Sequence, residues 1–179
     1  MTTQTETPSL SSLEYLAYLN EDGSIREDVV GKIGVYAIFD REKTLQYVGY
    51  SRDIYLSLKQ HLVRQPQNCY WIKLQTIARP SRKILEAIAS AWIDQNGVTP
   101  VGNGEANAAW TQAIDAKVTM TEEEKAQYQQ NDELGQIKML KKIARRVEAD
   151  LKQRLSTRGV TMDIRFNPKL KEKGLLDLK

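Results

Sequence analysis

Residues 34–61 read GVYAIFDREKTLQYVGYSRDIYLSLKQH, and this stretch decides how the chain folds. Its β-branched and aromatic residues predict two short strands, near Val35 to Phe39 and near Leu45 to Gly49, joined by a polar turn. Neighbouring strands lie about 5 Å apart. We therefore expect a β-hairpin that sets Tyr36 and Tyr47 side by side.

A helix is predicted directly after this hairpin. Asp53 can cap its first turn, and apolar residues then recur one turn apart until about Arg64. This periodicity sets Ser57 and His61 on a different face from the apolar residues. Two phenols and the chain's only histidine could then form a site, although each is equally at home in an ordinary core or on a surface.

The rest of the chain predicts a mixed fold. The further elements, in chain order, are a short helix from Leu13 to Asn20, a strand near Tyr70 to Ile77, a helix from Ile84 to Trp92, a short helix from Ala106 to Ile114, a long helix from Thr121, and a small strand from Thr161 to Phe166 before a charged tail. We expect an α/β fold of the α+β type. Its small antiparallel three-stranded sheet is flanked by helices in the order β-β-α-β-α, with a long C-terminal helix. The expected divisions are 1–30 (tail and short helix), 31–104 (sheet domain) and 105–179 (basic helical extension).

Composition favours a cytoplasmic protein or one in another reducing compartment. The single cysteine, Cys69, allows no internal disulfide framework or cysteine metal site. No apolar run approaches the ~20 residues of a membrane span. Met1 to Ser9 is polar and lacks the features of a secretory signal, which predicts a disordered lead.

Charge is distributed unevenly along the chain. Acidic residues outnumber basic ones in Met1 to Ile33, and the reverse holds in Ile137 to Lys179. A cationic helix side of this kind suits phosphate backbones or an acidic protein surface. The alternative is a solvated helix face. The predicted nucleic-acid or partner-binding residues are Lys138, Lys141, Lys142, Arg145 and Lys152.

Several motifs together resemble those of the GIY-YIG nuclease family. They are the triplets Gly34-Val35-Tyr36 and Tyr47-Val48-Gly49, the following Tyr50 to Ile54 with Leu58 and His61, and the later Leu85-Glu86-Ala87 and Pro100-Val101-Gly102-Asn103. The similarity extends over Gly31 to Asn103. It implies a metal-dependent endonuclease acting on DNA or RNA.

The resemblance also implies roles for single residues. Glu86 would bind the metal, Mg²⁺, which tolerates a single carboxylate because it keeps several waters. Tyr36, Tyr47 and His61 would be the catalytic residues that handle protons around the attacking water. Gly49 and Asn103 would complete the site. From the residues alone, Glu86 could equally be a solvated helix residue, and Asn103 a turn residue.

Ser57 departs from the family pattern, which implies an arginine at this position. A hydroxyl cannot replace a guanidinium against phosphoryl charge. Arg52 or Arg64 could supply the missing cation, because arginine side chains are long. The resemblance therefore implies either a nuclease with impaired or altered activity, or a noncatalytic descendant that binds nucleic acid or a protein. A protein partner would use the C-terminal helix.

Overall fold

The structure is a computed structural model that describes residues 7–179. The predicted disordered lead lies outside the described residues up to Glu6, while Ser9 is ordered and caps a 3-10 helix, η1 (Leu10–Ser12). The chain divides into two compact units, unit 1 (Met1–Thr111) and unit 2 (Gln112–Lys179). The boundaries expected at residues 30 and 104 stay predictions.

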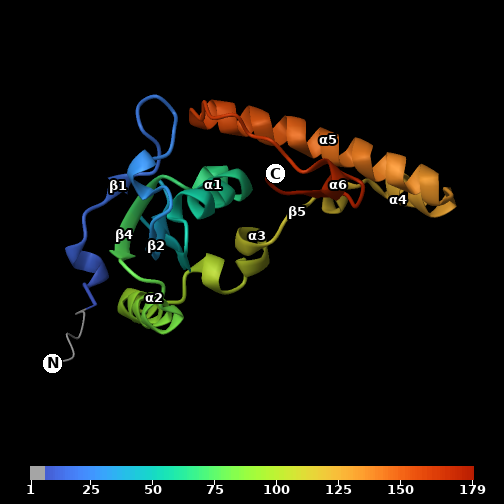
Figure 1. The fold of residues 1–179 in the computed structure, drawn as a ribbon. Helices are drawn as coiled ribbons and strands as arrows, with labels where there is room; N and C mark the ends of the chain where they lie inside the picture. Colours follow the sequence, from blue (N-terminus) through green and yellow to red (C-terminus); the bar gives the residue numbers. More distant parts are fainter. Residues whose placement is uncertain (1–6) are drawn as a thin grey trace. The chain divides into compact units, whose positions relative to one another are not determined.

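Unit 1 is built on an antiparallel sheet, in which β1, β4 and β2 are labelled in Figure 1. The full strand order is β1-β4-β2-β3. The predicted hairpin is confirmed as β2 (Ile33–Phe39) and β3 (Leu45–Ser51), and the third predicted strand as β4 (Trp71–Ile77). The order β-β-α-β-α is confirmed from β2 onward. The mixed α/β class with an antiparallel sheet therefore holds.

The sheet has four strands, so the prediction of three was wrong. The additional strand, β1 (Leu16–Ala17), pairs with β4 in the region where a helix from Leu13 to Asn20 was expected. The spacing of Leu13, Leu16 and Leu19 fits a helix, but the backbone instead extends, and the Tyr18 amide donates to the Tyr70 carbonyl. Pairing with a sheet edge here outweighs local helical periodicity.

The helices of unit 1 cover the two faces of the sheet. Asp53 caps α1 (Ile54–Arg64) as predicted, and Ser81 caps α2 (Arg82–Asn96). The short α3 (Asn107–Thr111) follows the 3-10 helices η3 (Pro66–Asn68) and η4 (Val101–Asn103), and η2 (Glu27–Val29) lies between β1 and β2.

Strand alternation separates two packing surfaces on the central strand β2. Val35, Ala37 and Phe39 join the buried core that α2 contributes to through Leu85, Ile88, Ala89 and Trp92. Tyr36 points to the other face, where it meets His61 of α1. The predicted phenol and imidazole therefore share one side of the sheet, and α2 lies on the opposite side.

Unit 2 is organised around the long helix α5 (Glu133–Arg158), which α4 (Glu122–Gln130) precedes (Figure 1). The buried side chains of α5 follow its predicted apolar stripe and include Leu140, Ala144, Leu151 and Leu155. The remaining elements are the 3-10 helix η5 (Ala116–Thr119), α6 (Pro168–Lys171), and the paired strands β5 (Ile114–Asp115) and β6 (Leu175–Leu176).

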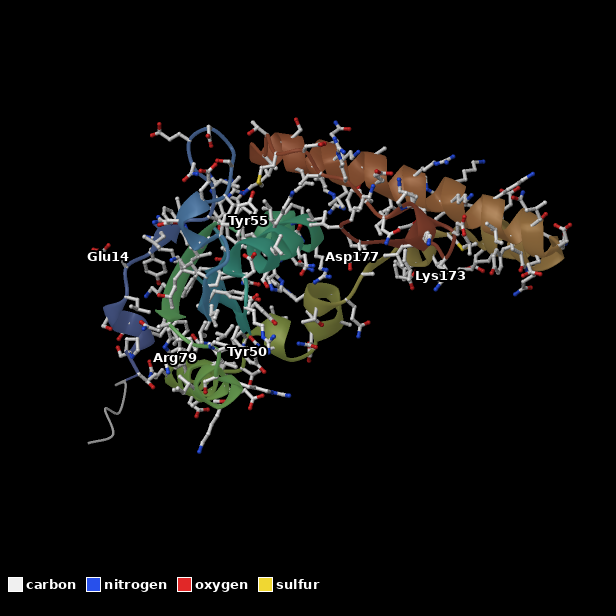
Figure 2. The ribbon with its side chains drawn as sticks, in the orientation of Figure 1. Glu14, Tyr50, Tyr55, Arg79, Lys173 and Asp177 are labelled. Carbon is white, nitrogen blue, oxygen red and sulfur yellow. The ribbon has the colours of Figure 1, made fainter. Side chains whose placement is uncertain are left out.

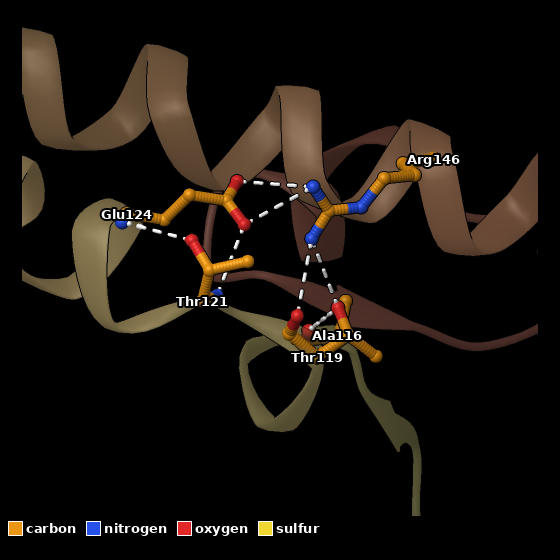
Figure 3. Close-up of polar contacts among 5 residues, drawn as sticks. All are labelled: Ala116, Thr119, Thr121, Glu124 and Arg146. Carbon is orange, nitrogen blue, oxygen red and sulfur yellow. Dashed lines mark hydrogen bonds and ion pairs between the residues drawn. The ribbon is translucent and has the colours of Figure 1, made fainter.

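Arg146 of α5 contacts both α4 and η5 (Figure 3). Its guanidinium contacts both carboxylate oxygens of Glu124, at 3.1 and 3.0 Å, and also donates to the backbone carbonyl and the hydroxyl of Thr119. Glu124 in turn completes a capping box with Thr121. This forked contact fixes α4 and η5 against one side of the long helix.

Two predictions for unit 2 were wrong. The single helix from Thr121 is two helices, because Asp132 caps α5 by accepting from the Gly135 amide. The expected strand at Thr161 to Phe166 is reduced to one bridge between Phe166 and Leu178. The charged tail, for which the sequence predicted no particular structure, contains α6 and β6. Among the described residues, no helix has the length and apolar character needed to cross a membrane.

Candidate functional site

Four side chains form an aromatic cluster on the α1 side of the sheet: Tyr36, Tyr47, His61 and Trp110. The Tyr36 hydroxyl and His61 Nε2 are 2.8 Å apart and hydrogen-bonded. Tyr47 stacks on Trp110 with ring centroids 5.4 Å apart and planes 6° from parallel. The rings of Tyr47 and His61 are 4.6 Å apart. The structure thus brings the two predicted tyrosines and the histidine together, and it adds a tryptophan that the sequence did not indicate.

Gly49 makes room for this arrangement. Tyr36 lies opposite Gly49 in the hairpin, and Tyr47 lies opposite Ile38, so the tyrosines are diagonal neighbours and not a direct pair. Their ring centroids are 6.1 Å apart. A Cβ on Gly49 would lie 2.7 Å from the Tyr36 hydroxyl oxygen and 2.5 Å from the Tyr47 ring. The glycine is therefore explained by packing of the aromatic cluster.

Burial keeps the cluster neutral. Tyr36 and His61 are only 3% and 4% exposed. Burial raises the pKa of Tyr36, with a smaller contribution from Tyr47, and burial likewise raises the pKa of Tyr47. Burial, helped by the positive charge of Arg64, lowers the pKa of His61 to about 3. Near neutral pH the cluster therefore contains no phenolate and no imidazolium.

The depressed pKa of His61 predicts that stability falls in acid. The unfolded chain takes up a proton on His61 below its ordinary pKa of 6.5, whereas the folded chain does so only near 3. The contribution of neutral His61 to the free energy of unfolding is thus complete above pH 6.5. It is lost as the pH falls toward 3, by about 1.4 kcal/mol per pH unit. Between pH 7 and 4.5 we expect the free energy of unfolding to fall by about 2 to 3 kcal/mol. Urea denaturation at each pH measures it.

His61→Gln is the matched control for this prediction, because an amide can still hydrogen-bond to Tyr36 but does not titrate. The variant should show a flatter dependence of stability on pH. Parallel curves for wild type and variant would contradict the prediction.

Glu86 lies apart from the aromatic cluster. It is on α2, where its carboxylate accepts from Arg82 Nε at 2.6 Å and from the Tyr50 hydroxyl at 3.0 Å. In Figure 2 Tyr50 lies beside α2, whereas Tyr55 lies by α1. The hydrogen bonds from Arg82 and then Tyr50 lower the pKa of Glu86. No contact of this carboxylate with the cluster is found among the described residues.

These surroundings do not fit the predicted Mg²⁺ site. The Glu86 carboxylate is already occupied by a guanidinium, and a second cation there would be repelled. No group of three or more histidine, cysteine or acidic residues that could hold a metal occurs in the part of the chain that the structure describes. Magnesium at Glu86 remains an untested prediction.

The positions of the predicted substitute cations differ. Arg64 lies near the cluster, since its Nη1 donates to the Trp110 carbonyl at 3.1 Å and its charge lowers the pKa of His61. Arg52 lines a different cavity, of about 290 Å³, together with Tyr50 and Arg82. The Ser57 hydroxyl donates to the Ser51 hydroxyl at 2.7 Å. Of the two predicted substitute cations, Arg64 is therefore the one whose charge acts on the cluster.

The side chain of Asn103 hydrogen-bonds to the backbone of the edge strand β3, on the side where no other described strand pairs with it. Its Oδ1 accepts from the Val48 amide and its Nδ2 donates to the Val48 carbonyl, both at 2.8 Å. These bonds satisfy edge-strand groups that would otherwise lie unpaired in a part-buried site. We expect Asn103→Ala to cost about 1 to 3 kcal/mol of unfolding free energy, measured by chemical denaturation.

Asn103→Asp is informative beside it, because the acid keeps the acceptor and replaces the donor by a group that repels the Val48 carbonyl. It should also destabilise the protein near neutral pH. Wild-type stability in both variants would show that the contact contributes nothing.

Cys69 is fully buried at the end of η3, with its thiol directed toward the His61 carbonyl at 3.6 Å. A reactive cysteine needs solvent access and surroundings that favour the thiolate. Solvent access is not provided at this position. Unit 1 therefore combines a neutral aromatic cluster with an inaccessible thiol.

Comparison with known proteins gives one informative relative. No protein-family model matches the chain. The chain is 35% identical over 78 residues to a protein of Arabidopsis thaliana named bifunctional monothiol glutaredoxin-S16, chloroplastic. The match covers 41% of this chain and 27% of the relative. The chain thus spans about a quarter of that protein's length.

This comparison contradicts the sequence-based assignment to the GIY-YIG nuclease family. The relative carries the name of a glutaredoxin and not of a nuclease, and no nuclease family model matches. We therefore correct the assignment. The endonuclease activity, the magnesium-dependent hydrolysis, the nucleic-acid binding function and the noncatalytic nuclease descendant that rested on the motifs are not carried forward.

Proposed function

We propose that this chain takes part in thiol–disulfide redox chemistry as the partner unit of a monothiol glutaredoxin, which supplies the reactive thiol. The observation that carries the proposal is the 35% identity to a bifunctional monothiol glutaredoxin over a quarter of that protein. The word bifunctional in the relative's name describes the whole protein. We assign the quarter that this chain matches to a part other than the one that holds the reactive thiol. The chain's own Cys69 is buried, which argues against a role as the thiol catalyst.

Unit 2 offers a surface for such a partner. Lys138, Lys142 and Arg145 are exposed and recur at helical spacing, so they form a basic stripe along one side of α5. None of the three forms an ion pair with another described residue. By contrast, Lys141 pairs with Glu172 and Lys152 with Glu148, so the charges of these two predicted binding residues are partly neutralised within unit 2.

Free cations on a rigid helix suit an acidic protein surface. Such contacts accelerate association and set orientation, and they weaken as salt rises. We therefore assign the basic stripe as the side that meets the glutaredoxin, and the proposal requires an acidic patch on that partner. The proposal therefore includes a protein partner at the C-terminal helix, where the sequence predicted one.

The test measures binding of the purified full chain to a recombinant monothiol glutaredoxin by isothermal titration at low and moderate salt. Reversing the stripe with the triple change Lys138→Glu, Lys142→Glu and Arg145→Glu should weaken binding at least about tenfold. The matched control reverses three exposed cations of unit 1, Arg41, Arg79 and Lys83. It should leave the affinity unchanged.

A second measurement separates the partner role from a thiol role. Glutathione-dependent reduction of a mixed disulfide is followed with the chain alone, as wild type and as Cys69→Ser. We expect no activity from either. Activity that Cys69→Ser abolishes would overturn the partner role, and absence of any binding to the glutaredoxin would overturn the proposal as a whole.

A further inference from the structure

A second cavity lies in unit 1, away from the aromatic cluster. It has a volume of about 690 Å³ and opens between η1, the turn after β2 and the end of α2. Its apolar lining comes from Leu10, Phe39 and Leu45, with the ring of Tyr15 at its side. Two lysines, Lys43 and Lys73, also line it. We call it the lysine pocket.

Lys73 brings a buried ammonium group to this pocket. The residue is only 4% exposed, and its Nζ donates to the Leu10 carbonyl at 2.9 Å. The same nitrogen lies 4.1 Å from the centroid of the Tyr15 ring. Burial lowers the pKa of Lys73. An ammonium carries several N–H donors, so this group retains capacity for a further acceptor.

Lys43 supplies the second ammonium from the hairpin turn. Its backbone has a φ of 65°, which is rare for a residue with a side chain. Its Nζ lies 4.8 Å from the centroid of Tyr15 and 5.0 Å from that of Trp71. The ammonium groups of both lysines therefore lie near the ring of Tyr15, and both residues line the lysine pocket.

Among the described residues, no aspartate or glutamate lines the lysine pocket. Neither Lys43 nor Lys73 forms an ion pair with any residue that the structure describes. A buried charge is normally paired, because desolvation without a counter-charge is costly. The aromatic faces and the Leu10 carbonyl compensate only in part.

We propose that the lysine pocket binds a small organic carboxylate, with the acid group between Lys43 and Lys73 and its apolar body against Phe39 and Leu45. The volume is that of a small-molecule site, and apolar walls with a few convergent polar groups are typical of such sites. This site is separate from the basic stripe of α5 and does not rest on the proposed redox partnership.

The test uses 1-naphthoate as the probe and the uncharged 1-naphthalenemethanol as its matched analogue, both titrated into the full chain by fluorescence. We expect saturable binding of the carboxylate, and at least about tenfold weaker binding of the alcohol, because charge-assisted hydrogen bonds provide the difference. Lys43→Met and Lys73→Met should each weaken naphthoate binding about tenfold or more. Lys83→Met, at an exposed lysine of α2 outside the pocket, should leave it unchanged.

Circular dichroism of each variant confirms that it is folded, and the exposed Lys43 provides a variant that leaves the core intact. Equal affinity for the acid and the alcohol would overturn the proposal. So would naphthoate binding that is unaffected by both lysine substitutions, or no saturable binding.

Discussion

Trp110→Ala is expected to lower the free energy of unfolding by about 3 to 5 kcal/mol. The side chain is 1% exposed. It stacks on Tyr47, and its ring centroid lies 5.7 Å from that of His61. Removing it would leave a large cavity between α1, α3 and β3, with Tyr47 lacking its stacking partner. Urea denaturation followed by circular dichroism measures the loss.

Trp71→Ala is the matched control, because Trp71 is only partly buried and one face of its ring meets Lys43. Its truncation should cost clearly less. Equal losses for the two tryptophans, or a loss below about 1 kcal/mol for Trp110→Ala, would mean that α3 does not depend on this side chain.

The aromatic cluster shows how far the sequence alone could lead. Alternation along two strands places Tyr36 and Tyr47 on one face, and helical spacing brings His61 toward them, so these three could be predicted. Trp110 could not, because it arrives from a short helix after a long loop. No local pattern encodes that docking.

Glu86 illustrates the opposite error. Strand alternation already assigns Tyr50 to the face opposite Tyr47, and Tyr50 is the tyrosine that contacts Glu86. The motif resemblance grouped Glu86 with Tyr36 and Tyr47, but the period-two geometry of β3 separates them. The alternation of side chains along β3 therefore predicted the surroundings of Glu86 better than the order of the motifs did.

The missed elements share a physical cause. β1 and β6 are two residues long, and each exists through pairing with a distant segment, β4 or β5. Such short strands have no periodicity to detect. The break between α4 and α5 did have a signal, since Asp132 is a strong helix N-cap. Continuous polar and apolar periodicity on both sides concealed it.

Gly34→Ala is expected to be the second strongly destabilising change, with a loss of about 3 kcal/mol or more. Gly34 lies in β2, paired on one side with Ser51 and on the other with Thr76. A Cβ built there would lie 2.3 Å from the carbonyl oxygen of Gln75 and 2.9 Å from the Thr76 Cα. Both are backbone atoms of the neighbouring strand, so the sheet itself would have to move.

Gly49 and Gly104 provide a comparison for the loss of stability expected at Gly34. At Gly49 the atoms in the way belong to the tyrosine side chains of the aromatic cluster, and at Gly104 the nearest atoms are at an ordinary 3.7 Å. Side chains adjust more easily than paired backbones, so the loss should decrease from Gly34→Ala to Gly49→Ala to Gly104→Ala, the last being close to wild type. Chemical denaturation of the three variants gives the order. A Gly34→Ala protein as stable as Gly104→Ala would show that β2 and β4 do not pair in the register described. Because this register places Tyr36 and Lys73 on opposite faces of the sheet, that placement would then also be wrong.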